Sequence, residues 1–167
     1  MTVDFDDWQH RADAVWQDGT LDDDARIAAI DALAAELGNE HPVALFERAG
    51  ARDSAGRELE AEPLYRAALA AGLDPVRRTR AVIQLASTIR NLGKVDESLA
   101  MLRDEYEATR GREMADEAAA FYALALTSSG DAVRAASVAL TALAPHLNSY
   151  TRSVTGYAAE LLAKSGE

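Results

Sequence analysis

The chain has 167 residues, is 49% hydrophobic and carries a formal net charge of −11 at pH 7. This length and composition suit one folded domain or one continuous array of repeats, whereas the acidic balance excludes a nucleic-acid binder, which needs clustered lysine and arginine to neutralise phosphates. The chain contains no cysteine, which excludes disulfides and thiolate chemistry.

Nine helices and no strands are expected along the chain. Alanine, the best helix former, makes up about a fifth of the residues. Pro42 and Asp74-Pro75 are typical of helix starts, and Gly38-Asn39 and Gly72 are typical of helix ends. The expected helices are 6–17, 22–37, 42–54, 58–71, 75–92, 95–109, 113–128, 130–145 and 150–164.

Four glycines recur at a fixed interval of 37 residues, at positions 19, 56, 93 and 130, and each is flanked by helical patterns. A fixed period between 20 and 50 residues is the signature of a repeat array. The sequence therefore predicts one all-α domain over 1–167. We expect about four helical hairpins and a C-terminal capping helix, over 5–38, 42–72, 75–110, 112–147 and 150–164.

Apolar and small residues recur in the same register. The inner face of the first helix of each hairpin is expected to hold Trp8, Leu45, Val82 and Ala119, followed four residues later by Ala12, Ala49, Ala86 and Ala123. In the second helices the corresponding inner positions are Tyr65, Leu102 and Ala139. Large and small residues that alternate in this way let two antiparallel helices interlock.

This spacing resembles the tetratricopeptide repeat, with the pattern W-x2-L-G-x2-Y followed by A-x3-F, A and P. The residues that carry the resemblance are Trp8, the Leu85-Ala86 pair and the segment Ala61-Glu-Pro-Leu-Tyr65-Arg-Ala-Ala68-Leu. The departures are a longer unit than the family's 34 residues, Arg11, Arg48 and Arg52 in place of Leu or Tyr, and Asp24 in place of alanine. The resemblance implies an α-solenoid with a right-handed superhelix.

Catalytic and metal-binding constellations are not found in the sequence. His10, His41 and His146 are far apart and lack metal-ligand spacing, and no glycine-rich phosphate loop or thiol nucleophile is present. The pair Glu58 and Glu62 is typical of an exposed acidic helix. We therefore expect a protein that is not an enzyme and has no catalytic residue, metal or cofactor.

A soluble cytoplasmic protein without a membrane partner is expected. The N-terminus is acidic and lacks the apolar segment of a secretory signal. The longest apolar run, Ala118 to Leu126, is too short to cross a bilayer.

The resemblance implies that the first helices of successive hairpins line a concave groove that holds a peptide. In that groove the sequence places a stripe with arginine and amides at its centre, which could bind a carboxylate-bearing peptide, although a merely solvated stripe would look the same. On helix 42–54 the stripe also includes Val43, Gly50 and Ser54. The candidate binding residues are Phe46, Glu47, Asp53, Arg80, Gln84, Ser87, Arg90, Asn91, Phe121 and Leu124.

The expected function is that of an adaptor for a protein or peptide partner. Residues 1–62 hold 16 acidic and 5 basic side chains, whereas residues 63–167 hold 12 of each, so all the excess acidity lies in the first part of the chain. This acidity is either a solubilising surface or a docking face for a basic partner.

Two alternatives follow from the acidic part of the chain. One is a self-associating subunit, a homo-oligomer in which the acidic part meets the cations of a neighbour: Arg77, Arg78, Arg80, Arg90 and Lys94. The other is a regulatory sensor that sequesters a basic partner of the DNA-binding or sigma type.

Overall fold

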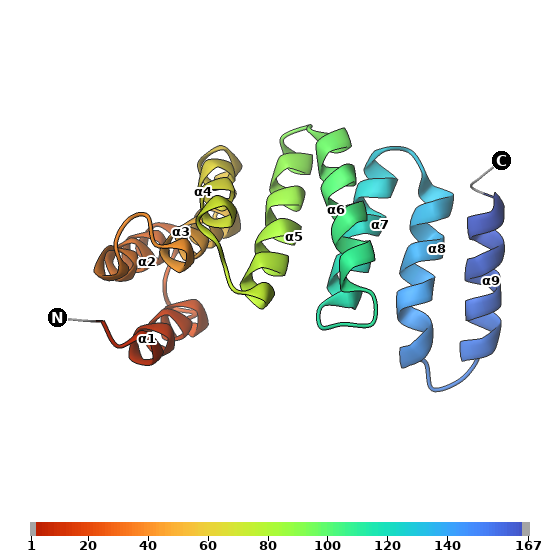
Figure 1. The fold of residues 1–167 in the computed structure, drawn as a ribbon, viewed down its shortest axis with the longest axis horizontal. Coiled ribbons are helices and arrows are strands. Elements are labelled where there is room, and N and C mark those ends of the chain that lie inside the picture. Colours follow the sequence, from red (N-terminus) through yellow and green to blue (C-terminus); the bar gives the residue numbers. More distant parts are fainter. Residues whose placement is uncertain (1–2, 165–167) are drawn as a thin grey trace. The chain divides into compact units, whose positions relative to one another are not determined.

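The computed structural model describes residues 3–164, and this part of the chain is helical throughout, without a strand (Figure 1). Its helices are α1 (Phe5–Gln17), α2 (Asp23–Leu37), α3 (Pro42–Ser54), α4 (Glu58–Ala71), α5 (Pro75–Asn91), α6 (Val95–Thr109), α7 (Ala115–Ser128), α8 (Ala132–Leu143), the 3₁₀ turn η1 (Ala144–His146) and α9 (Thr151–Lys164). The expected helices are confirmed, and their ends agree with the sequence-based ranges to within two residues. None of the described helices is both long and apolar enough to cross a membrane.

Aspartates cap several helices at their N-termini. The Asp4 carboxylate accepts hydrogen bonds from the first backbone N–H groups of α1, and Asp22 accepts one from the Ala25 N–H at 2.8 Å at the start of α2. Asp131 does the same for α8 through the Arg134 N–H at 3.0 Å. Part of the acidity of the chain thus satisfies helix-terminal donors and complements the helix dipoles.

Three of the regularly spaced glycines form the same turn. Gly56, Gly93 and Gly130 have φ values of 70°, 84° and 93°, a region that residues with a side chain rarely adopt. In each turn the next residue donates its N–H to the carbonyl five positions back, in the pairs Arg57–Arg52, Lys94–Ile89 and Asp131–Leu126, at 2.9 Å every time. The 37-residue period of the sequence is therefore a repeated helix-ending turn. Gly19, by contrast, is not among the glycines with positive φ.

The chain divides into two compact units, the first ending at Thr88 and the second beginning at Ile89, so that the boundary falls within α5. In the first unit α2 packs on α1 and α3, and α3 packs on α4. In the second unit α7 packs on α6 and α8, and α8 packs on α9. Within both units, helices that follow each other in the chain pack against each other, as in a helical-hairpin array.

The predicted core register is confirmed in most of its positions. The inward-facing residues of the first helices are buried: Trp8, Leu45, Val82, Ala119, Ala12, Ala49, Ala86 and Ala123. Tyr65 and Leu102 in the second helices are buried as well. The alanines leave room for the large side chains of the neighbouring helix, as the alternation of sizes predicted.

The register of α8 was predicted wrongly. Ala139 is exposed, whereas Val138 and Ser137 are buried. The reason is the contact of α8 with α9, where the Ser137 hydroxyl donates a 2.7 Å hydrogen bond to the Ala158 carbonyl. A buried hydroxyl needs such a partner, so this bond sets which side of α8 faces α9.

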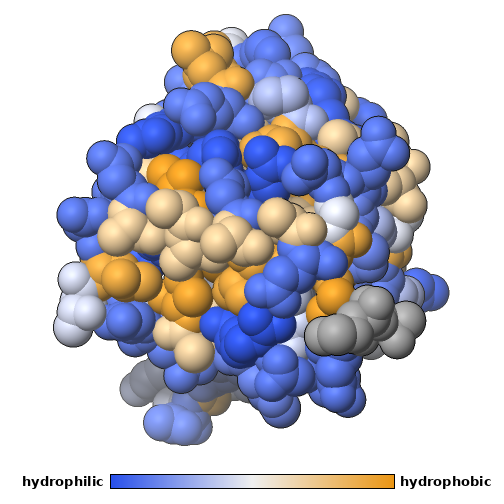
Figure 2. Space-filling view, turned by 90° about the vertical axis from the view of Figure 1, so that its left-hand side faces the viewer, coloured by the Kyte–Doolittle hydropathy of each residue, from blue (hydrophilic) through white to orange (hydrophobic). Residues whose placement is uncertain are grey.

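The face of the molecule on the side of α1 and α2 is largely hydrophilic, with a band of apolar side chains across it (Figure 2). At this end of the first unit, α2 exposes several alanines: Ala25, Ala28, Ala32 and Ala35. Their spacing of three and four residues places these alanines along one face of the helix.

Candidate functional site

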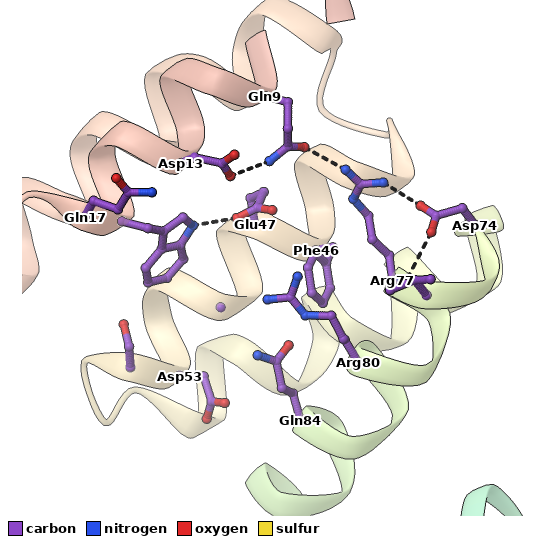
Figure 3. Close-up of a pocket in the computed structure, with 14 residues that line it drawn as sticks. Gln9, Asp13, Gln17, Phe46, Glu47, Asp53, Asp74, Arg77, Arg80 and Gln84 are labelled. Atoms are coloured by element: carbon purple, nitrogen blue, oxygen red, sulfur yellow. Dashed lines mark hydrogen bonds and ion pairs between the residues drawn. The ribbon is translucent and has the colours of Figure 1, made fainter. Parts of the chain in front are cut away.

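A cleft of about 640 Å³ opens in the first unit between α1, α3 and the N-terminal part of α5 (Figure 3). These are the helices that the sequence places first in each of three successive hairpins. The cleft is lined by Gln9, Asp13, Trp16 and Gln17 of α1, by Phe46, Glu47, Gly50, Asp53 and Ser54 of α3, and by Asp74, Val76, Arg77, Arg80 and Gln84 at α5. All of these residues precede the boundary between the two units.

Glu47 is the most deeply buried acidic group of the cleft, with 8% of its surface exposed. Its Oε2 accepts a 2.6 Å hydrogen bond from the indole Nε1 of Trp16, which joins α3 to α1. Burial raises the pKa of Glu47 above its usual value, although the Trp16 bond and the nearby positive charges of Arg80 and Arg77 oppose this rise. The Glu47 carboxylate at the floor of the cleft therefore lies where burial disfavours its negative charge.

Asp53 lies one and a half turns further along α3 and bridges three helices. Its Oδ1 accepts a hydrogen bond from the Thr88 hydroxyl of α5 at 2.9 Å, and its Oδ2 accepts one from the Tyr65 hydroxyl of α4 at 3.3 Å. Burial raises the pKa of Asp53, and these hydrogen bonds oppose the rise. Both donors are neutral hydroxyls, and no cation among the described residues is bonded to this carboxylate.

A continuous chain of polar contacts runs along one edge of the cleft (Figure 3). Asp74 accepts from the Arg77 guanidinium at 2.6 Å, and the other end of that guanidinium donates to Gln9 Oε1 at 2.7 Å. The Gln9 amide in turn donates to Asp13 at 2.8 Å. These bonds fix the orientation of Arg77 and Gln9 and connect the start of α5 to α1.

Two polar groups one turn apart on α5 form no hydrogen bond with the described residues. The Arg80 guanidinium lies over the Phe46 ring, 5.6 Å from its centroid, and forms no hydrogen bond or ion pair with any described residue. The Oε1 atom of Gln84 is buried and, within the described part of the chain, accepts no hydrogen bond. A buried acceptor without a donor is costly, so a bound molecule that supplied one would be stabilised here.

The structure brings half of the predicted site residues together. Phe46, Glu47, Asp53, Arg80 and Gln84 all line the cleft. Ser87 lies on α5 in the same unit but does not line it, and Arg90, Asn91, Phe121 and Leu124 belong to the second unit and do not line it either.

Val43, placed by the sequence in the groove stripe, is a core residue instead. It is buried in a cluster with Trp8 and Ala12, against which Leu33 and Leu37 of α2 pack. Its stripe position, four residues before Glu47, therefore turns toward the α1–α2 hairpin rather than toward the cleft.

The residues contributed by α1 were missed, although the repeat contained the signal for them. Subtracting the 37-residue period from the α3 positions 46, 50, 53 and 54 gives Gln9, Asp13, Trp16 and Gln17, which are the α1 residues of the cleft. The stripe was identified on three helices and not extended to the first. Arg77 was noted only as part of a basic cluster, because its partners Asp74 and Gln9 come from different helices.

Among the described residues, no group of three or more histidine, aspartate or glutamate side chains could hold a metal ion. The cleft therefore offers hydrogen-bonding groups, charges and aromatic faces, which are the means of noncovalent recognition.

Helical hairpins that follow one another in the chain and pack in sequence define a helical-repeat protein. The family model described as Tetratrico peptide repeat matches residues 42–161, and the chain belongs to this family. The match begins at the first residue of α3 and leaves out α1 and α2, the hairpin whose turn lacks a glycine of positive φ. A comparison with curated proteins finds no match. Proteins of this repeat family generally mediate protein–protein interactions, and the repeats are typically non-catalytic scaffolds.

Proposed function

We propose that this protein is an interaction adaptor that binds an extended segment of a partner protein in the cleft of its first unit. The observation that carries the proposal is a pair of groups on α5 that form no hydrogen bond with the described residues, the Arg80 guanidinium and the Gln84 side-chain carbonyl oxygen. They offer a donor and an acceptor one helical turn apart. An extended backbone presents carbonyl and N–H groups at a similar spacing, so one segment can satisfy both.

The size and walls of the cleft support the same function. A volume of about 640 Å³ accommodates a few residues of an extended chain. Trp16 provides aromatic surface, and Gly50 beside it has no side chain that would fill the cleft. Aromatic anchors beside a few fixed polar groups are common at protein-recognition sites.

Self-association through the basic cluster receives less support. Arg77 is bonded within its own chain to Asp74 and Gln9, and Arg80 stacks on Phe46. Two of the five cations expected to meet a neighbouring molecule thus contact residues of their own chain at the cleft. This favours an adaptor over a self-assembling subunit.

The test begins with peptides selected from a displayed random library on the immobilised protein. Their affinities are then measured for wild type and for Gly50→Leu, which places a bulky side chain at the cleft, and Gln84→Leu, which removes the acceptor. The matched control is Gly156→Leu, because Gly156 is also inside a helix and a side chain there meets nothing within 4 Å.

We expect both cleft variants to bind at least about tenfold more weakly than wild type, since they lose contact surface or a buried hydrogen bond. The control should bind as wild type does, and thermal melts identify any variant that fails to fold. Equal binding by wild type and a folded cleft variant would contradict the proposal.

A further inference from the structure

We propose that the segment bound in this cleft inserts a basic side chain, an arginine or a lysine, which lies beside the Glu47 carboxylate and the ring of Trp16. This inference rests on the proposed function and specifies the chemistry of the partner. It follows from the hydrogen bonds, the charges and the aromatic side chains of the cleft.

Two acceptors of the cleft have no hydrogen-bond donor among the described residues, although the Arg80 guanidinium also has N–H groups without an acceptor there. Glu47 accepts one hydrogen bond, from Trp16, and within the described residues its other carboxylate oxygen has no donor. The buried Gln84 Oε1 has none at all among those residues. A guanidinium or an ammonium brings several N–H donors on one group, whereas a carboxylate would bring only further acceptors.

The charges of the cleft point the same way. Four carboxylates line it, from Asp13, Glu47, Asp53 and Asp74, against two guanidiniums, from Arg77 and Arg80. Arg77 already forms an ion pair with Asp74. The remaining carboxylates therefore outnumber the remaining cation, and a positively charged ligand group reduces this imbalance while a negative one increases it.

Other carboxylates of the first unit show what pairing with a cation does. Asp31 is bonded to Arg52 and Arg48, and these hydrogen bonds lower its pKa. Glu36 is bonded to Arg11, which lowers its pKa as well. Glu47 differs because burial raises its pKa and no guanidinium is bonded to it. A basic ligand group would give Glu47 the kind of partner that Asp31 and Glu36 already have.

The aromatic walls suit a cation. One guanidinium, that of Arg80, already lies over the Phe46 ring at 5.6 Å from its centroid. Trp16 lines the same cleft and holds the Glu47 carboxylate at its indole edge. Cations interact favourably with the faces of aromatic rings, most of all with tryptophan. A basic side chain could therefore form an ion pair with the Glu47 carboxylate and a cation–π contact with the Trp16 ring.

The surrounding charge favours the approach of a basic segment. The chain up to Thr88 holds 17 acidic and 9 basic side chains, a net charge of −8. This field attracts a basic peptide and repels an acidic one before contact is made. The carboxylate-bearing peptide that the arginine and amide stripe suggested is therefore replaced, as the preferred ligand, by a basic one.

The experiment uses three libraries of short, end-capped peptides that differ only at their central residue, which is arginine, its neutral isostere citrulline, or glutamate. Binding to the full-length protein is measured at constant ionic strength. We expect the arginine library to bind at least about tenfold more tightly than the citrulline library and the glutamate library to bind most weakly.

Two variants then locate the effect. Glu47→Gln, which keeps an acceptor for Trp16, should bring the arginine and citrulline affinities close together. Glu40→Gln removes the same charge from an exposed turn outside the cleft and should leave the preference unchanged.

Equal binding of arginine and citrulline peptides to wild type would overturn the inference while leaving the proposed function in place. Tighter binding of glutamate peptides would overturn it too and would indicate an anion at Arg80. If none of the three libraries bound, both the inference and the proposed function would be wrong.

Discussion

The indole N–H of Trp16 donates a 2.6 Å hydrogen bond to the carboxylate of Glu47, 31 residues later in the chain. This contact joins the first helix of one hairpin to the first helix of the next at the floor of the cleft. A buried carboxylate and a buried indole N–H each cost free energy when they lack a hydrogen-bond partner, and this bond gives each of them one. The stability and the chemistry of the cleft therefore depend on the same pair of residues.

Replacing Trp16 with phenylalanine keeps a ring but removes the donor, and it leaves the buried Glu47 carboxylate without its hydrogen bond. We expect Trp16→Phe to destabilise the protein by about 1–3 kcal/mol in chemical denaturation. In a Glu47→Leu background the same replacement should cost clearly less, because no carboxylate is left unpaired. Additive effects of the two replacements would show that the bond contributes little.

Neutralising Glu47 should stabilise the folded state at pH 7. Burial raises the pKa of Glu47 in the folded protein, so its ionisation disfavours folding as pH rises from the unfolded-state pKa through the folded-state pKa. Glu47→Gln removes this cost. Its advantage should be complete above the raised pKa and should disappear at a pH below the usual pKa of glutamate, where wild type is also neutral.

This dependence is measured by urea denaturation over a pH series, with Glu40→Gln as the control for loss of one surface charge. A Glu47→Gln variant that is less stable than wild type at pH 7 would show that the charged form is favoured in the cleft.

Gly50→Ala should stabilise the protein by about 0.5–1 kcal/mol, since glycine inside a helix costs conformational entropy. A Cβ at this position meets Trp16 at 3.4 Å, which is an ordinary contact distance. Gly156→Ala in α9, where the Cβ meets nothing within 4 Å, provides the reference gain. Thermal melts compare the two, and destabilisation by Gly50→Ala alone would mean that Trp16 cannot adjust.

The core register of α5 can be tested at two adjacent residues. Leu85 is 1% exposed and Ala86 is fully buried. Leu85→Ala should cost about 2–5 kcal/mol through the cavity that it leaves, and Ala86→Leu should cost about 1–3 kcal/mol through overpacking. Chemical denaturation measures both, and unchanged stability in either variant would contradict the register.

The helices and most of the core were predictable because they depend on local signals. Proline at helix starts and glycine in turns act over a few residues. The turns at Gly56, Gly93 and Gly130, which recur every 37 residues, form the same hydrogen bond. Ala139 was misplaced because the face of α8 is set by the contact of Ser137 with Ala158, 21 residues later in the chain, which no local pattern records.

The cleft was predictable only in part for a similar reason. Periodicity identified Glu47 and Gln84 as facing one side of their helices. It did not show that Glu47 is buried and bonded to Trp16, or that Arg77 is held by Asp74 and Gln9, because these are contacts between helices. The donors and acceptors that remain unpaired can be identified only once these contacts are known, and the chemistry of the ligand is inferred from them.

The central claim, that the cleft of the first unit holds the partner segment, is tested most directly by nuclear magnetic resonance of the two tryptophan indole N–H groups. The chain contains only Trp8 and Trp16. Trp16 lines the cleft, whereas Trp8 is fully buried in the core and donates to the Leu33 carbonyl at 2.7 Å. On titration with a library-selected peptide, we expect the Trp16 signal to shift and the Trp8 signal to stay in place. A peptide that binds without moving the Trp16 signal would contradict this claim.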